Sequence, residues 1–148
     1  MPRTTPGLAL VLILAGMLLA GCGQPTVNAA PGAAVTVEPI EGTELARITL
    51  SEQAAERLAI QTEPVRDEAR AGEPRAVVPF AAVVYDALGN TWAYTSSEPL
   101  VFVRHAITVD FIEGDDAVLT DGPSAGTKVV TVGAAELYGA ETGVGGGH

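Results

Sequence analysis

Residues that can serve as nucleophiles or general bases are few and far apart in this chain. It contains one cysteine, Cys22, and two histidines, His105 and His148. His148 ends a glycine-rich stretch, where it cannot keep the fixed geometry that catalysis requires. His105 lies beside Arg104 in a β-rich run, where a surface histidine is the simpler expectation. No Gly-x-Ser-x-Gly, Ser-x-x-Lys or phosphate-binding glycine loop occurs. The sequence therefore predicts a protein that is not an enzyme, with His105 the best catalytic candidate if it were one.

Acidic residues near two turns are the only candidates for a metal site. Calcium binds several carboxylates and carbonyls, but the spacing of these acids does not fit an EF-hand loop. Soft metals require clustered Cys, His or Met, and no such cluster is present. The sequence predicts no metal and no cofactor, and leaves cation binding by the acidic turns as an alternative. The acids concerned are Asp110, Glu113, Asp115, Asp116 and Asp121.

The charge balance argues against two kinds of partner. The chain of 148 residues has 18 Asp and Glu against 8 Lys and Arg, a formal net charge of −10. Nucleic acid requires a basic surface, and docking onto anionic lipid requires a polybasic patch, so neither fits. We interpret the acidic surface as a source of solubility.

The N-terminal residues predict the compartment. Arg3 precedes an apolar run over Gly7–Ala20 that is too short for a transmembrane helix and is typical of a secretory signal. The run ends in Leu19-Ala-Gly-Cys22, which resembles the bacterial lipobox. The resemblance implies cleavage between Gly21 and Cys22 and attachment of diacylglycerol to the Cys22 thiol. The protein would then be anchored to membrane lipid on the extracytoplasmic side. An ordinary signal peptide that contains a cysteine and a retained anchor helix are the alternatives.

Composition divides the remainder into three parts. Residues 22–43 have almost no large apolar side chains and predict a flexible tether. Residues 44–139 carry the apolar runs of a single domain. Residues 140–148 predict a glycine-rich tail. The mature chain keeps no cysteine pair, so its fold must be stable without a disulfide.

The sequence of this domain predicts short strands separated by turns. We expect a strand over 44–50, a short helix capped by Ser51, an extended segment over 60–66 and a polar loop over 67–75. The central expectation is a hairpin over Val77–Thr95, with its turn at 86–90.

Later runs complete the expected sheet. A long β-rich run at 100–112 should bend near 104–106 because one flat strand is shorter. Strands follow at 117–120 and 128–132, and a short helix at 134–138. The fold class is mainly β, a small β-roll or barrel-like domain of about seven short antiparallel strands with one or two short helices.

Two blocks together resemble one family, the periplasmic adaptor (membrane fusion protein) subunits of RND-type efflux pumps. The first, Ile48–Val65, is similar to the strand, short helix and "Gly-Ile-x-Thr-x-x-Val" segment of the adaptors, with Ala59 in place of the usual Gly. The second, within Val78–Leu137, is similar to the membrane-proximal domain and ends in the closing pattern Gly126-Thr-Lys-Val-Val-Thr-Val-Gly-Ala.

The resemblance implies a reduced adaptor. In a full adaptor a lipoyl domain, an α-helical hairpin and a β-barrel separate the two blocks, whereas here only residues 66–75 do. The chain would be a lipid-tethered membrane-proximal domain that contacts an integral membrane permease, with its oligomeric state open. The metal-binding residues of some heavy-metal adaptors have no counterparts here.

A second function of another class stays open. A stand-alone extracytoplasmic ligand-binding lipoprotein would need a concave apolar pocket beside Trp92 and Tyr94. Against it stands the expectation that these two residues, with Phe80 and Phe102, mostly form the core.

Overall fold

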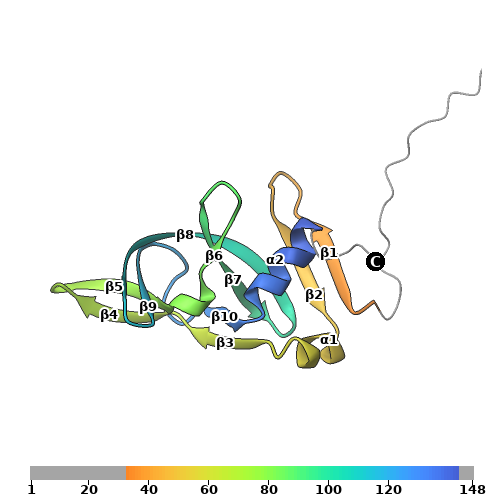
Figure 1. Ribbon diagram of the computed structural model, residues 1–148, viewed down its shortest axis with the longest axis horizontal. Helices are drawn as coiled ribbons and strands as arrows, with labels where there is room; N and C mark the ends of the chain where they lie inside the picture. Colours follow the sequence, from red (N-terminus) through yellow and green to blue (C-terminus); the bar gives the residue numbers. More distant parts are fainter. Residues whose placement is uncertain (1–32, 144–148) are drawn as a thin grey trace, which may run out of the picture.

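The computed structural model describes residues 33–143. The predicted signal peptide, Cys22 and the last five residues lie outside this range. The described chain folds as an antiparallel sheet curled into a half-barrel, with two short helices (Figure 1). The strands are β1 (Val35–Pro39), β2 (Ala46–Leu50), β3 (Gln61–Pro64), β4 (Arg66–Arg70), β5 (Glu73–Pro79), β6 (Val84–Tyr85), β7 (Thr91–Glu98), β8 (Val101–Glu113), β9 (Asp116–Asp121) and β10 (Lys128–Val132). The helices are α1 (Glu52–Arg57), α2 (Ala134–Thr142) and the single-turn 3-10 helix η1 (Phe80–Ala82).

The predicted fold class is confirmed. Seven strands follow one another in the order β3-β10-β7-β8-β9-β5-β4, and all their pairings are antiparallel. Strand β2 joins β8 and carries β1 at its other edge, while β6 pairs with β7. Within the described range, no helix is long and apolar enough to cross a membrane.

The segment β2–α1–β3 forms as its sequence predicts. Ile48 and Leu50 alternate into the core, as β2 requires. The Ser51 hydroxyl oxygen then accepts a hydrogen bond from the Ala54 amide at 3.1 Å, which caps α1. Ala59 has φ +50°, so this alanine adopts the left-handed conformation that a glycine would favour.

The ordered domain is longer at both ends than the predicted range 44–139. Val35–Pro39, within the predicted tether, pairs residue for residue with β2. Two valines on this strand, Val35 and Val37, pack against the core, which supplies the apolar contact that composition alone had hidden. At the other end α2 runs to Thr142, because Glu141 turns its side chain onto the sheet.

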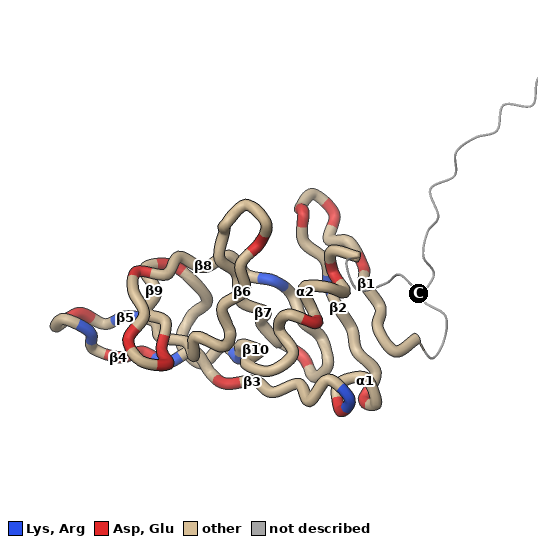
Figure 2. The backbone as a smooth tube through the Cα atoms, viewed as in Figure 1, with Lys and Arg blue, Asp and Glu red and all other residues tan. Residues whose placement is uncertain are grey.

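The predicted polar loop at 67–75 is wrong: this segment belongs to the hairpin β4–β5. Its strands pair from Arg66 opposite Val77 to Arg70 opposite Glu73. Ala71 and Gly72 connect them with φ of +52° and +85°, the signs that a two-residue hairpin turn needs. The hairpin extends from one end of the molecule and carries charges of both signs (Figure 2).

The expected hairpin over Val77–Thr95 is only partly correct. Val77 and Val78 pair with β9 instead, opposite Val118 and Ala117. The chain then turns through η1, and only the two residues of β6 pair with the start of β7 across the predicted turn. A proline and small residues at 79–82 break the first apolar run, so its two halves belong to different parts of the sheet.

Strand β8 is continuous over 13 residues, including the stretch 104–106 where a bend was expected. Its irregularities lie instead between Thr108 and Phe111, where the register against β9 shifts twice. Up to Ile107 the strand pairs with β7, and beyond it only with β9. The bulges therefore mark the point at which β8 passes from one half of the sheet to the other.

The core lies in two clusters along this sheet. Tyr94 and Phe102 are buried as expected, whereas Phe80 is 43% exposed and Trp92 is half-buried. The first cluster joins β2, α1 and α2, and its buried members are Ile48, Leu50, Ala54, Tyr94, Phe102, Val130, Ala134 and Leu137. The second lies toward the β4–β5 hairpin and comprises Val65, Val78, Ala82, Ala93, Ile107, Ala117, Leu119 and Val129.

Substitutions at two glycines test the packing of Ile60, just before β3, against the start of α2. Gly133 has φ +90°, and a Cβ there would lie 2.2 Å from Ile60 Cδ1, whereas Gly126 has φ +86° and open space around it. Gly133→Ala should lower the free energy of unfolding by about 2–4 kcal/mol through backbone strain plus overpacking. Gly126→Ala should lower it by about 1–2 kcal/mol through strain alone. Urea unfolding followed by Trp92 fluorescence measures both.

A second substitution separates the two causes. Ile60→Val removes the clashing Cδ1 atom, so adding it to Gly133→Ala should recover part of the lost stability. Equal losses in the two glycine variants would contradict the packing described.

Candidate functional site

The residues singled out for chemistry are not brought together. Gly21, Cys22 and His148 lie outside the described residues. His105 is exposed on β8, opposite Ala93 of β7. The structure therefore places no nucleophile-and-base pair around the one histidine that it describes.

The most complete constellation of polar side chains surrounds Arg104, and sequence reasoning missed it. The Arg104 guanidinium lies over the Trp92 ring, 4.1 Å from its centroid, and 5.8 Å from that of Tyr138. Its Nε is 3.3 Å from Glu141 Oε2, which also accepts a hydrogen bond from the Tyr94 hydroxyl. We call these five residues the Arg104 cluster. The one clue to this cluster in the sequence is Glu141, an acidic residue within the predicted tail over 140–148.

Burial decides what the Arg104 cluster can do. The Glu141 side chain is 4% exposed and that of Arg104 11%, so each charge needs the other. Burial, followed by the Glu141 carboxylate, raises the pKa of Tyr94 well above its usual range, which keeps the hydroxyl a neutral donor. Glu141 also accepts a hydrogen bond from the Ala46 amide at 3.3 Å. The cluster therefore fastens α2 to β2, β7 and β8.

Three of the five acids near the turns are paired with arginines of the β4–β5 hairpin. Arg70 Nε lies 3.0 Å from Glu113 Oε2, and Arg75 lies 3.3 Å from Asp110. Arg66 pairs with Asp116. We call this set the hairpin ion network. Over residues 33–143 no group of three or more His, Cys, Asp or Glu is arranged to hold a metal ion.

Alternating charge could have revealed this network. Arg66, Glu68 and Arg70 are spaced two apart, so on a strand they share one face, and Glu68 accepts from both arginines. That period of two is the signature of a strand in a segment without large apolar residues. The side chains are partly exposed, so each pair contributes modestly to stability.

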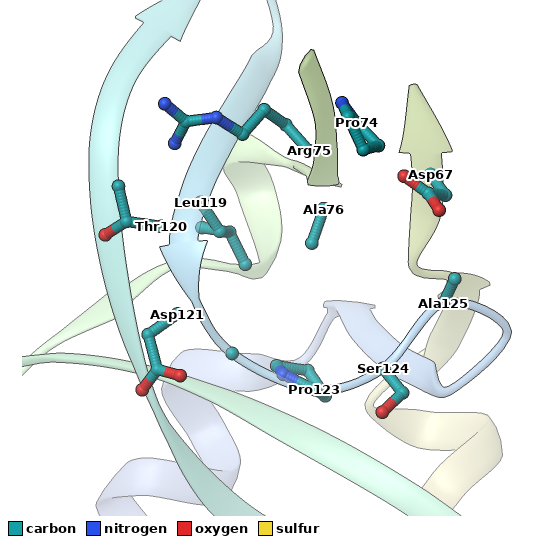
Figure 3. A pocket seen from close by; sticks show the side chains of 11 residues that line it. Asp67, Pro74, Arg75, Ala76, Leu119, Thr120, Asp121, Pro123, Ser124 and Ala125 are labelled. Atoms are coloured by element: carbon teal, nitrogen blue, oxygen red, sulfur yellow. The ribbon is translucent and has the colours of Figure 1, made fainter. Parts of the chain in front are cut away.

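A small polar hollow of about 280 Å³ lies between the β4–β5 hairpin and the segment after β9 (Figure 3). Asp67 and Arg75 come from the hairpin, and Asp121, Pro123 and Ser124 from the other wall. The charged side chains are of both signs, and Arg75 is already paired with Asp110. The only cation in the lining is therefore already paired, and the ion pairs of the described residues include neither Asp67 nor Asp121.

A larger open groove of about 750 Å³ runs beside Trp92, between the β6–β7 hairpin and the second half of β8. We call it the Trp92 groove. Tyr85, Phe111 and Ile112 line it and are 54%, 42% and 42% exposed. Tyr94, which the ligand-binding hypothesis placed at a pocket, is fully buried and does not line this groove.

The Trp92 groove is thus an open hollow with exposed apolar residues beside an aromatic residue of the sheet. Comparisons with protein-family models, with curated proteins and with solved structures find no match to the chain.

The Arg104 cluster predicts a coupled loss of stability. Glu141→Gln leaves Arg104 without its counter-charge and should lower the free energy of unfolding by about 3 kcal/mol. Tyr94→Phe removes one charge-assisted hydrogen bond and should lower it by about 2 kcal/mol. The double variant should lose less than the sum of the two, because both changes break the same contact. Strict additivity in urea unfolding would show that Tyr94 and Glu141 do not interact.

Asp86 predicts a measurable titration. The Asn90 side chain, with the Trp92 indole and two backbone amides, lowers the pKa of Asp86 from 3.8 to about 2. Because the folded value is the lower one, the carboxylate stabilises the turn above pH 3.8 and this contribution disappears as the pH falls through about 2. Carboxyl NMR of Asp86 should give a midpoint of about 2.

Two variants test the cause. Asn90→Ala removes the main donor, so the Asp86 midpoint should rise toward 3.8. Leu88→Ala keeps the backbone donor and should leave the midpoint unchanged. An unchanged midpoint in Asn90→Ala would overturn the assignment of the donor.

Proposed function

We propose that this protein is a lipid-anchored extracytoplasmic lipoprotein that acts as a reduced adaptor, an accessory subunit of an RND-type efflux transporter. It is not an enzyme: its role is to hold a small β-domain at the membrane surface against an integral permease. Cys22 carries the anchor, and the exposed edges and turns of the domain carry the contact.

One observation supports the adaptor part above the others. The two blocks that resemble the membrane-proximal domain fold into one sheet with a shared core. From the first block, β3 pairs with β10 of the second, and β2 pairs with β8. Ile48 and Leu50 pack in the same cluster as Phe102 and Leu137. Such packing is what a membrane-proximal domain assembled from two distant blocks requires.

The short connection between the two blocks supports the proposal that this adaptor is reduced. In a full adaptor this connection carries the lipoyl, hairpin and barrel parts, whereas here it is the short hairpin β4–β5. The hairpin is held to β8 and β9 by the hairpin ion network, so the connection is itself part of the sheet.

The anchor is supported by the position of Cys22 relative to the domain. The lipobox-like Leu19–Cys22 follows an apolar run, and β1 begins at Val35. A cysteine anchored in lipid would therefore hold the domain within a short span of the membrane surface.

A stand-alone ligand-binding lipoprotein is the second candidate. The Trp92 groove, with its exposed Tyr85, Phe111 and Ile112, is the observation that favours it. The groove is open along its length, so it would suit an extended or flat ligand better than an enclosed small molecule.

Crosslinking in cells tests the proposal. A photo-crosslinking amino acid at Leu88, which is 89% exposed, or at Ala71, at the tip of the β4–β5 hairpin, should capture a polytopic transporter from the membrane fraction. Cys22→Ser in the same chain should release the protein from membranes and abolish that crosslink, because the domain loses its anchor.

The contrary outcomes are distinct. Membrane attachment that persists in Cys22→Ser contradicts lipidation. Crosslinks only between copies of this chain contradict the accessory role, even where the anchor is confirmed.

A further inference from the structure

An apolar groove of about 520 Å³ lies between α2 and β1. Figure 1 shows α2, in blue, beside β1 and β2, and the helix contacts both strands. Two buried leucines, Leu50 and Leu137, line the groove deep in the first core cluster. Three partly buried residues, Val35, Val37 and Leu58, line it nearer the surface. We call this hollow the α2 groove.

Small residues of α2 keep the α2 groove open. Gly139 and Ala140 line it at positions where a longer side chain would fill it. A Cβ at Gly139 would meet no atom within 4 Å, so no neighbouring side chain takes up this space. The groove therefore leaves apolar core surface accessible from outside, and an apolar group that covered this surface would be stabilised by its removal from water.

The lining of the α2 groove disfavours anionic ligands. Its one charged residue is Glu136, which is exposed and takes part in no ion pair among the described residues. No lysine or arginine lines the groove to offset this charge. A fatty acid carboxylate or a phosphate headgroup would be repelled there, whereas an uncharged acyl chain would not.

The segment that leads to Cys22 starts at this groove. Val35 is the first residue of β1 and also part of the groove lining, and Cys22 precedes it by 13 residues. Thirteen residues span at most about 45 Å when extended, which is enough to bring a lipid on Cys22 back to the groove. Because lipid and groove belong to one molecule, they meet at an effective concentration on the order of millimolar.

Cover for one acyl chain would change the strength of a lipid anchor. Two acyl chains hold a protein stably on a bilayer, whereas a single chain gives only marginal, reversible attachment. An open groove buries a chain less completely than a bilayer does, so it does not withdraw the chain from the membrane. It lowers the cost of exposing that chain to water once the protein has left.

We propose that the α2 groove shelters one acyl chain of the Cys22 anchor when the protein leaves a bilayer, which makes the attachment reversible. The chain lies against Leu50 and Leu137, between β1 and α2. The inference rests on the proposed lipidation of Cys22 and goes beyond it, because it gives the lipid a binding site on the protein itself.

Membrane partitioning tests the proposal. The full chain, lipidated in the cell that expresses it, is mixed with sucrose-loaded phosphatidylcholine vesicles over a range of lipid concentrations, and the bound fraction is measured by sedimentation. The native chain should partition as a protein with one exposed acyl chain does, with a constant on the order of 10⁴ M⁻¹. Gly139→Leu fills the groove, so its constant should be at least about tenfold higher.

A matched substitution on the same helix is the control. Ala135 is exposed on α2 and does not line the groove, so Ala135→Leu adds the same side chain without filling it and should partition as the native chain does. Leucine is a better helix former than glycine, so Gly139→Leu should fold, and urea unfolding checks this. Ala140→Leu fills the groove from a second position and should repeat the Gly139→Leu result.

Crosslinking locates the acyl chain. A photo-crosslinking amino acid at Leu58, which lines the groove, should join the acyl chain on Cys22 of the same molecule in the vesicle-free supernatant. The same amino acid at Leu88, which is 89% exposed and outside the groove, should not. Mass spectrometry of the digested protein identifies the joined fragments.

Three results would overturn the inference: equal partitioning of the native chain and both groove-filling variants, an equal shift in Ala135→Leu, or crosslinks from Leu58 to vesicle lipid or a second copy in place of the Cys22 chain. A lipidated protein that gives any of these still has its anchor. A protein whose mass shows no acyl group on Cys22 contradicts the anchor and the inference together.

Discussion

The fold depends on one strand that must serve two halves of a sheet. Strand β8 pairs with β2 and β7 along its first part and with β9 along its second. A regular strand cannot change neighbours while keeping one flat pleat, and the bulges between Thr108 and Phe111 supply the required twist. Each core cluster lies along one part of β8, with Phe102 in the first and Ile107 in the second.

Charged groups hold the periphery of each half in different ways. Near α2 the Arg104–Glu141 pair is buried, so the removal of either partner leaves an uncompensated charge. Along the β4–β5 hairpin the pairs are partly exposed and overlapping, and each tolerates the loss of another. The first arrangement fixes one orientation of a helix, whereas the second keeps a polar hairpin aligned.

Local chemistry made part of this fold predictable from the sequence. Ser51 caps α1, and the apolar alternation of Ile48 and Leu50 gives the direction of β2, because both effects act within a few residues. The partner of Val77–Val78 was not predictable, since β9 lies some forty residues further on and a nearer hairpin was equally consistent with the pattern. Strand β1 was missed because pairing with β2 orders a segment whose own composition is nearly featureless.

The candidate site was less predictable than the fold. Trp92 and Tyr94 stood out as aromatic residues in the sequence. Only the folded sheet shows that Trp92 borders an open groove, whereas Tyr94 is buried and donates a hydrogen bond to Glu141. The shape of the Trp92 groove has no sequence signature, because it depends on where β7 begins beside β8.

The hairpin β4–β5 gives the domain a point at which its chain can be lengthened. Its two strands leave the core side by side and are joined by Ala71 and Gly72, an exposed two-residue turn. A folded unit of almost any size could be spliced between Arg70 and Glu73 and would find its two attachment points already adjacent, with the rest of the sheet undisturbed. The same geometry works in reverse: deletion of such a unit leaves two strand ends that one tight turn can reseal. A fold with this architecture can gain or lose a whole module in a single genetic step.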